Sequence, residues 1–204
     1  QNSGISQAKN IQGKIKDMDY VSPERMVEEA VGNGCQSIAY TYNEPTVYTE
    51  YALSIMRLAR EAGLKNVWVS NGYMTEEALG EIIPLLDAIN VDLKSFDDSF
   101  YRDNCSARLQ PILDNLKILK QEQVHLELTT LIIPGLTDDI QQLEQLVEFI
   151  SSDLDDDTPW HISKFSPQIS WKMKDKPATG DDIIYEAYEI GKEAGLHYIY
   201  LGNA

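Results

Sequence analysis

Three short polar segments carry the side chains best suited to chemistry in this 204-residue chain, and each directly follows an apolar segment of strand length. The first is Tyr42-Asn43-Glu44-Pro45-Thr46. Its Glu44 carboxylate can accept hydrogen bonds from a ligand ammonium, whereas Asn43 and the backbone N–H groups of a helix start can hold a carboxylate or phosphate. A helix cap followed by a loop proline explains the same residues equally well, so both interpretations stay open.

The other two segments are a turn and a charged strand end. Ser70-Asn71-Gly72 is as typical of an ordinary turn as of a ligand-binding loop. In Asp92-Leu93-Lys94, the period of two along a strand sends both charged side chains to the same face. A structural ion pair between Asp92 and Lys94 is the simpler interpretation, because charges at the end of an apolar strand need partners.

Isolated polar residues elsewhere indicate function less strongly. Thr129-Thr130 lies inside an apolar strand, and a lone strand histidine such as His161 is usually a satisfied core residue rather than a metal ligand or a general base. Cys35 and Cys105 are far apart in the sequence. This spacing predicts two buried thiols, with neither a disulfide framework nor a self-contained zinc or iron–sulfur site.

The elements that must position these residues alternate between strand and helix, which is typical of a parallel sheet built from βα units. Ser22-Pro23 predicts a helix start, with the serine as cap and the proline in the first turn. The predicted strands are 35–42, 66–70, 88–94, 125–133, 160–165 and 198–201. The predicted helices are 22–32, 46–62, 75–86, 110–122, 138–151 and 180–194. Because ligands bind at the carboxyl ends of strands in such folds, the segments that follow the strands are the expected site.

Charge and composition exclude several classes of function. The formal net charge is −16, from 17 Lys and Arg against 33 Asp and Glu, which argues against binding to nucleic acid or anionic lipid. The sequence has no apolar stretch of about 18 residues and starts with neither a basic segment nor an apolar core, so we expect no membrane span and no signal peptide. The expectation is a cytoplasmic, enzyme-sized α/β domain.

Taken in order, five segments resemble one family, the radical SAM enzymes related to pyruvate formate-lyase activating enzyme, and within it the AmmeMemoRadiSam-system subfamily. The segments are Tyr40-Thr41-Tyr42-Asn43-Glu44-Pro45-Thr46, Val69-Ser70-Asn71-Gly72, Val91-Asp92-Leu93-Lys94, Ile133-Pro134-Gly135-Leu136 and Trp160-His161-Ile162-Ser163-Lys164-Phe165. The resemblance runs from Gln1 to Ala204 with the motifs in matching order, which makes it far more specific than any single motif.

The resemblance implies a partial (β/α)6 TIM-like barrel of parallel strands that binds S-adenosylmethionine (SAM) and a 4Fe–4S cluster. One-electron reduction of SAM in such enzymes yields a 5′-deoxyadenosyl radical, which abstracts hydrogen from a substrate. Tyr42, Asn43 and Glu44 match the family's glycine-glycine-glutamate segment, which holds the methionine ammonium. The other cofactor-binding residues that the resemblance implies are Ser70, Asn71, Asp92, Lys94 and Thr130.

Part of the family's pattern is missing from the sequence. The family holds its cluster with a Cys-x3-Cys-x2-Cys loop after the first strand, and in close relatives the last cysteine is followed by Gln-Asn, which are residues 1 and 2 here. We therefore expect the first strand and the cluster cysteines upstream of Gln1, and residues 1–204 to be a single truncated core domain that is inactive alone. Ser166 stands near the position where pyruvate formate-lyase activators carry a histidine, which weakens a direct claim to that activity.

The resemblance also implies partners, namely a protein substrate such as a glycyl radical enzyme and an electron donor such as flavodoxin or ferredoxin. Two alternative functions stay open. One is a non-catalytic SAM-binding or scaffold protein without the cluster loop. The other is a barrel lyase that forms a Schiff base on Lys94, with Glu44 or Asp92 as acid and base.

Overall fold

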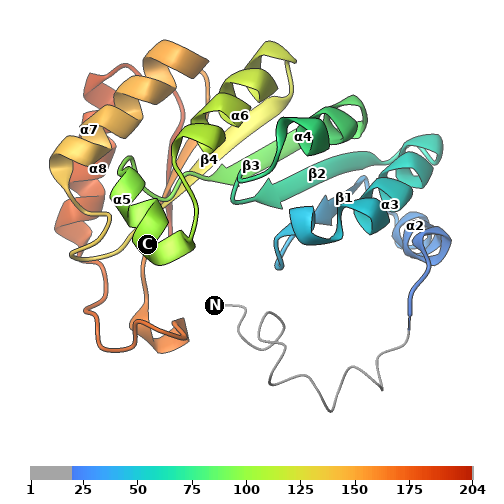
Figure 1. Cartoon of the computed structure of the whole chain (residues 1–204), viewed down its shortest axis with the longest axis horizontal. Helices are drawn as coiled ribbons and strands as arrows, with labels where there is room; N and C mark the ends of the chain where they lie inside the picture. Colours follow the sequence, from blue (N-terminus) through green and yellow to red (C-terminus); the bar gives the residue numbers. More distant parts are fainter. Residues whose placement is uncertain (1–19, 204) are drawn as a thin grey trace.

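Six parallel strands form one curved sheet in the computed structural model, which describes residues 20–203 (Figure 1). The strands are β1 (Ser37–Tyr40), β2 (Lys65–Ser70), β3 (Ala88–Asp92), β4 (His125–Ile132), β5 (Trp160–Lys164) and β6 (Ile199–Gly202). Each strand pairs in parallel with the next one along the chain, so the order across the sheet is the order in the sequence. This singly wound topology is that of a barrel wall, and the described strands form part of one.

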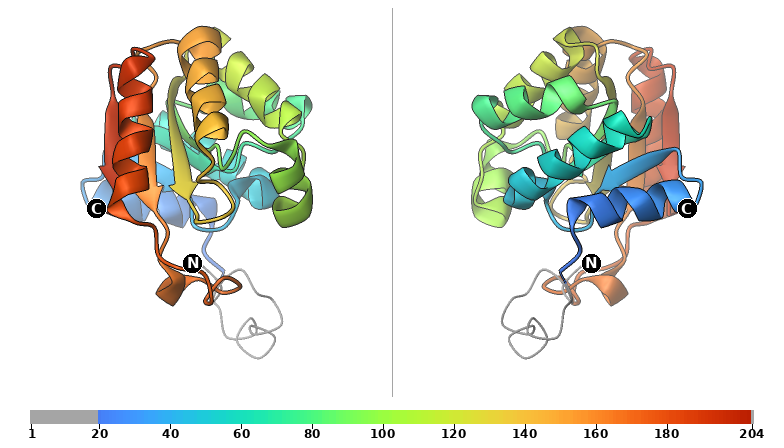
Figure 2. Two further views of the ribbon diagram at one scale, coloured as in Figure 1. Left: turned by 90° about the vertical axis from the view of Figure 1, so that its left-hand side faces the viewer. Right: turned by 90° about the vertical axis from the view of Figure 1, so that its right-hand side faces the viewer.

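The connecting helices cover the outer face of the curved sheet, as two side views show (Figure 2). Right-handed crossovers that all step in the same direction place every connecting helix on the same face. The longer helices are α2 (Pro23–Gly32), α3 (Thr49–Glu61), α4 (Glu76–Ile82), α6 (Gln110–Gln121), α7 (Ile140–Phe149) and α8 (Asp181–Glu193). Shorter helical turns are η3 (Pro45–Tyr48), η4 (Ile83–Leu85), α5 (Asp98–Phe100), η5 (Tyr101–Cys105), η6 (Ile150–Leu154) and η7 (Pro167–Ile169). No helix among residues 20–203 is both long and apolar enough to cross a bilayer.

Side-chain caps fix where several helices begin. The Ser22 hydroxyl accepts a hydrogen bond from the backbone N–H of Arg25, as its position before Pro23 predicts. Thr75 caps α4 and Asp139 caps α7 in the same way. These caps satisfy N–H groups that have no partner inside the helix, and each contributes about 1 kcal/mol to stability.

The core lies between the sheet and its helices. Alternate residues of β4, beginning with Leu126, are buried against the helices, whereas the residues between them face the concave side of the sheet and stay half-exposed. Trp68 of β2 and Trp160 of β5 are fully buried in the same layer. The strand period therefore decides which side chains pack in the core and which face the inside of the barrel.

The structure confirms the α/β fold class and all six predicted strands, and it corrects some details. The predicted helix 46–62 is divided into η3 and α3, because the backbone at Tyr48 leaves the helical region. Cys35, which we expected in a strand, precedes β1 after the turn at Gly34. Both cysteines were expected to be buried, but Cys35 and Cys105 are exposed because they lie in connections outside the strands.

Candidate functional site

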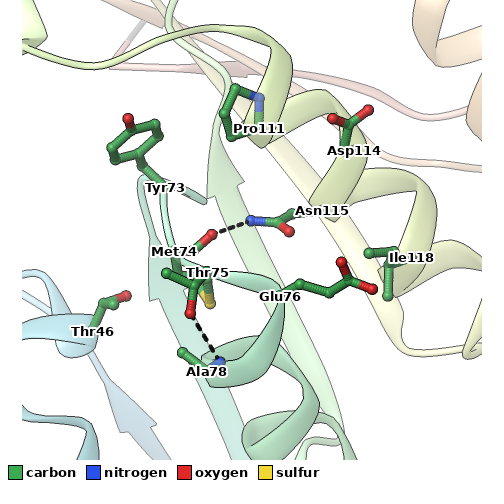
Figure 3. A pocket seen from close by; sticks show the side chains of 10 residues that line it. All are labelled: Thr46, Tyr73, Met74, Thr75, Glu76, Ala78, Pro111, Asp114, Asn115 and Ile118. Atoms are coloured by element: carbon green, nitrogen blue, oxygen red, sulfur yellow. Dashed lines mark hydrogen bonds between the residues drawn. The ribbon is translucent and has the colours of Figure 1, made fainter.

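Two cavities lie near the loop that follows β2, and only one of them contains predicted site residues. The larger, of about 560 Å³, is between that loop and α6 on the outer side of the sheet, and none of the eight predicted residues lines it (Figure 3). The smaller, of about 280 Å³, lies at the carboxyl ends of β1, β2 and β3. Its lining residues are Thr41, Tyr42, Asn43, Glu44, Val69, Ser70, Asn71, Asp92 and Lys94. We call this smaller cavity the strand-end cavity.

Glu44 connects the loops that follow β1 and β2. Its Oε1 accepts hydrogen bonds from Ser70 Oγ at 2.7 Å and from Thr46 Oγ1 at 2.8 Å, and its Oε2 accepts one from the backbone N–H of Asn71 at 2.8 Å. It also caps η3 through the backbone N–H of Thr46. The carboxylate is thus held in one orientation. Within residues 20–203 the backbone N–H of Asn71 is the one donor to Oε2, which can therefore also accept from a ligand.

The loop after β2 is closed by its own side chains. Ser70 is almost fully buried, and its hydroxyl accepts from the backbone N–H of Gly72 at 3.0 Å while it donates to Glu44. Asn71 Oδ1 accepts from the backbone N–H of Tyr73 at 2.8 Å, which leaves its amide NH₂ to donate elsewhere. Gly72 has a φ of +70°, and a Cβ there would lie 2.8 Å from Val91 Cγ1. Only glycine fits this turn, so the position of Asn71 is well defined.

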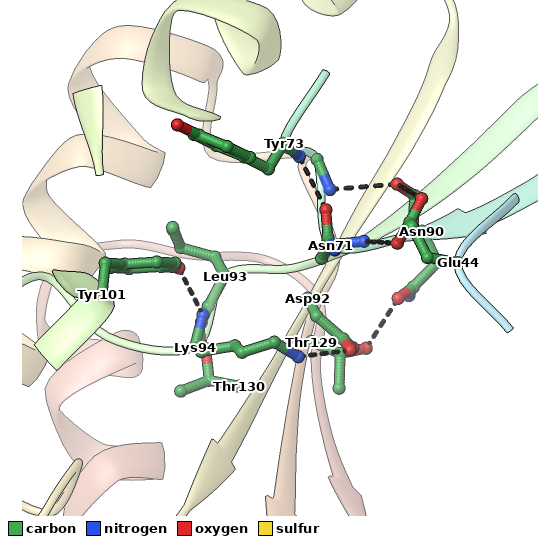
Figure 4. Close-up of polar contacts among 12 residues, drawn as sticks. Glu44, Asn71, Tyr73, Asn90, Asp92, Leu93, Lys94, Tyr101, Thr129 and Thr130 are labelled. Atoms are coloured by element: carbon green, nitrogen blue, oxygen red, sulfur yellow. Dashed lines mark hydrogen bonds and ion pairs between the residues drawn. The ribbon is translucent and has the colours of Figure 1, made fainter. Parts of the chain in front are cut away.

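Asp92 and Lys94 form the charged wall of the strand-end cavity. Lys94 Nζ contacts Asp92 Oδ2 (Figure 4), at a distance of 2.7 Å. The Lys94 side chain is 34% exposed and that of Asp92 is 42% exposed. The predicted ion pair is therefore present, and it lies beside a cavity. The Lys94 ammonium has three N–H donors, so it can donate to an anion in the cavity while it keeps its contact with Asp92.

Tyr101 positions the backbone of Lys94, and the sequence alone did not identify it as a residue of the site. Its hydroxyl accepts a hydrogen bond from the backbone N–H of Lys94 at 2.9 Å. Burial raises the pKa of Tyr101 well above its usual range, so the hydroxyl stays neutral. Tyr101 lies in η5, a five-residue π-helix whose formation no simple periodicity predicts. Thr41 and Val69 also line the cavity and were missed, although their positions at strand ends were a signal.

The backbone at Tyr42 is in the left-handed region, with a φ of +72°. A non-glycine residue pays about 1 to 2 kcal/mol for this conformation. The resemblance described above places a glycine here in the family, and glycine adopts positive φ freely. This chain therefore has the left-handed backbone conformation that glycine favours, but the residue at this position is Tyr42.

Thr130 does not line the strand-end cavity. It is fully buried, donates to the carbonyl of Leu93 at 2.9 Å and accepts from Trp160 Nε1 at 2.9 Å. The alternation along β4 turns Thr130 toward the helices and its neighbour Thr129 toward the concave face, where Thr129 donates to Asn90 Oδ1 at 2.9 Å. The geometry thus indicates a structural role for Thr130.

The described residues do not fit a 4Fe–4S cluster. Within residues 20–203 no group of three or more His, Cys, Asp or Glu side chains is arranged to hold a metal ion, and Cys35 and Cys105 are exposed free thiols. His161 is paired with Glu127, since its Nε2 lies 2.7 Å from Glu127 Oε2. The chemistry that this part of the chain supports is the binding of a zwitterionic ligand by Glu44, Lys94 and their neighbours.

Comparisons with known sequences agree on one family. The model of the Radical SAM superfamily matches residues 3–150. The uncharacterized protein MJ0808 of Methanocaldococcus jannaschii is 39% identical over 183 residues, which are 90% of this chain and 54% of that protein. The (2S)-3-sulfopropanediol dehydratase activating enzyme of Klebsiella oxytoca is 23% identical over 137 residues, 67% of this chain and 42% of that enzyme. The chain thus spans about half the length of these relatives or less.

Solved structures share the fold. A domain of pyruvate-formate lyase-activating enzyme from Bacteroides vulgatus superposes with a TM-score of 0.70 at 16% identity, covering 82% of this chain and 99% of that domain. SuiB of Streptococcus suis, bound to its precursor peptide SuiA, gives 0.71 at 12% identity, covering 92% of this chain and 43% of SuiB. Members of the superfamily use SAM and a 4Fe–4S cluster in general. The family model matches more than half of the chain and shows that this chain belongs to the radical SAM superfamily.

Proposed function

We propose that residues 1–204 form one core domain of a cytoplasmic radical SAM enzyme, and that the strand-end cavity binds the amino-acid part of SAM. One observation carries this proposal. A carboxylate (Glu44), an ammonium (Lys94) and a neutral amide (Asn71) come from the ends of three neighbouring strands and line one cavity. A zwitterionic amino acid needs this combination of groups.

Each polar group has a proposed role. The methionine ammonium donates to Glu44 Oε2, which also accepts from the backbone N–H of Asn71. The methionine carboxylate lies against Lys94, whose position is fixed by Asp92 and by Tyr101 through the backbone. The cavity of about 280 Å³ is slightly smaller than typical small-molecule pockets, roughly 300 to 1,000 Å³, which suits an amino-acid group rather than the whole nucleoside.

Bound SAM would supply radical chemistry after one-electron reduction, and the described residues would bind and orient it. Curated relatives named as activating enzymes support a protein substrate of the glycyl radical enzyme class. SuiB with its bound precursor peptide shows that a protein of this fold binds a peptide. A one-electron donor such as flavodoxin or ferredoxin completes the proposed set of partners.

Titration calorimetry with SAM tests the proposed site. The protein should bind SAM, and 5′-methylthioadenosine, which lacks the amino-acid part, should bind at least about tenfold more weakly because it loses both charged contacts. The Lys94→Met variant should weaken SAM binding about fivefold to tenfold, a value reduced for partial exposure.

Lys65→Met is the matched control for Lys94→Met. Lys65 also forms a 2.7 Å ion pair, with Asp87, but it lies outside the strand-end cavity. We expect this variant to bind SAM as the wild type does. Equal losses in the two variants, or equal binding of SAM and 5′-methylthioadenosine, would contradict the assignment of the site.

A further inference from the structure

The larger cavity, of about 560 Å³, lies on the outer side of the sheet and has no role in the proposed binding of SAM. We call it the outer cavity. It lies between the loop and helix start at 73–78 and one face of α6 (Figure 3). Its lining residues are Thr46, Tyr73, Met74, Thr75, Glu76, Ala78, Pro111, Asp114, Asn115 and Ile118.

Much of the outer cavity is lined by apolar side-chain atoms. Met74 is buried and forms part of its inner surface, and Ala78, Pro111 and Ile118 contribute further apolar groups. The Tyr73 side chain stands at the edge and is 40% exposed. Ligand pockets typically combine such apolar walls with a few polar groups that fix orientation, so the polar groups define which ligand fits.

Asn115 brings an oriented hydrogen-bond acceptor to this cavity. Its side chain is 5% exposed, and its Nδ2 donates to the carbonyls of Gly72 at 3.0 Å and Met74 at 2.9 Å. Among the hydrogen bonds of residues 20–203, none uses its Oδ1. Two carbonyls hold the amide in one orientation, so the free oxygen is fixed as well. Trp68 Nε1 is the buried side-chain nitrogen or oxygen without a partner among the described residues, so Asn115 Oδ1 is not sealed from solvent and a ligand N–H can reach it.

Two carboxylates give the outer cavity its charge. Glu76 reaches from the start of α4 toward α6, and Asp114 lies on α6 one residue before Asn115 (Figure 3). Asp114 Oδ1 accepts from Gln110 Nε2 at 2.8 Å, which leaves its other oxygen available. The described lining contains no lysine, arginine or histidine. Its polar groups therefore favour a cation that donates hydrogen bonds.

We propose that the outer cavity binds an organic cation, a primary ammonium or guanidinium on an apolar skeleton. The skeleton packs on Met74 and Ile118, one N–H donates to Asn115 Oδ1, and the charge faces Glu76 and Asp114. The same chemistry is offered by a free amine and by a lysine or arginine side chain of a peptide. This site is independent of the strand-end cavity, although its loop continues directly from Asn71.

The test follows backbone and Asn115 side-chain amide signals of the ¹⁵N-labelled full chain by NMR. The probes are 2-phenylethylamine and the peptide N-acetyl-Phe-Lys-amide, with 2-phenylethanol and N-acetyl-Phe-norleucine-amide as their uncharged counterparts. We expect at least one cationic probe to shift the signals of Met74, Thr75 and the Asn115 amide below about 10 mM, and its counterpart to bind at least about fivefold more weakly.

Paired variants make the test specific. Glu76→Gln combined with Asp114→Asn should weaken the cationic probe about fivefold to tenfold, because two exposed charges beside the cavity are removed. Glu77→Gln combined with Glu122→Gln removes two nearby exposed carboxylates that do not line the cavity, and should change affinity less than about twofold. Amide spectra of both variants verify that the fold is kept.

Each outcome decides the proposal. Binding of the amine alone identifies a free metabolite as the source, and binding of the peptide alone identifies a protein side chain. Either result supports a cation site. The proposal is overturned if neither cationic probe shifts these signals, if the uncharged counterparts bind equally well, or if the two double variants lose affinity equally.

Discussion

Two halves of the same sheet use their inward-facing polar residues in different ways. At the ends of β1 to β3, the polar groups come from the last residues of the strands and from the loops that follow, and they surround the strand-end cavity. On β4 and β5 they come from the strands themselves and pair with each other: Glu127 Oε2 lies 2.7 Å from His161 Nε2, and the ring of His161 stacks on Tyr200 at 5.0 Å.

The difference follows from the spacing of a sheet. Paired strands lie about 5 Å apart, so long polar side chains on neighbouring strands can reach each other even at diagonal positions. Glu127 reaches His161 in this way, although His161 is opposite Thr129. The loops that follow the strands lie farther apart than the strands do. Their polar side chains therefore surround the strand-end cavity. Glu44 and Lys94 therefore keep capacity for a ligand, whereas Glu127 and His161 use theirs on each other.

Among the substitutions that distinguish the two halves of the sheet, we expect the largest effect, on SAM affinity, for Glu44→Gln. The substitution removes the proposed partner of the methionine ammonium and turns an NH₂ group toward the backbone N–H of Asn71 or the hydroxyl of Ser70. Losing a charged hydrogen bond costs about 1.5 to 3 kcal/mol, which predicts a loss of SAM affinity of about tenfold to a hundredfold. Calorimetry measures it, with the exposed Glu50→Gln as a control that should bind like the wild type. Unchanged affinity in Glu44→Gln would remove Glu44 from the site.

A smaller effect, on stability alone, is expected for Thr130→Val. The substitution leaves Trp160 Nε1 buried without an acceptor and removes the donor to Leu93. We expect the free energy of unfolding to fall by about 1 to 3 kcal/mol in a urea titration, with SAM affinity unchanged. Thr129→Val, at the half-exposed neighbour, should cost less. A selective loss of SAM binding in Thr130→Val would restore the cofactor role that the family resemblance implies for Thr130.

The smallest effect concerns the pH dependence contributed by Glu127. Partial burial opposes its ionisation, but hydrogen bonds from His125 and His161 outweigh this and lower its pKa below the ordinary value. A lowered folded-state pKa stabilises the fold above the unfolded pKa, about 4.3, and this contribution is lost as the pH falls through the folded value. The side chain is one-third exposed, so we expect less than about 1 kcal/mol.

Urea titrations at a series of pH values measure this contribution. The wild type should lose more stability than Glu127→Gln as the pH falls from about 5 to about 3. At neutral pH the variant should be the less stable of the two. Parallel pH profiles for the two proteins would show that the Glu127 pair contributes nothing to folding.

Much of the fold was predictable because local patterns and tertiary structure agree. Apolar strand segments and a cap such as Ser22 predict strands and a helix start directly. The residues at the strand-end cavity were predictable in type, since Glu44, Asn71 and Lys94 follow strands whose carboxyl ends meet at one edge. The hydrogen bonds between these residues were not predictable, because the bonds join loops that are far apart in the sequence.

What sequence reasoning could not decide depends on strand phase and on irregular structure. Thr129 and Thr130 are chemically identical neighbours, and only the phase of β4 decides which one faces the inside of the barrel. Tyr101 reaches Lys94 from a π-helix, which has no sequence signature. Cys35 and Cys105 are exposed because they lie in connections, where residue type predicts burial poorly.

A crystal structure of the protein with SAM tests the central claim most directly. We expect the methionine ammonium within hydrogen-bonding distance of Glu44 and the methionine carboxylate beside Lys94, at the carboxyl ends of β1 to β3. Electron density for the amino-acid part of SAM against Glu127 and His161, or anywhere outside the strand-end cavity, would contradict the account.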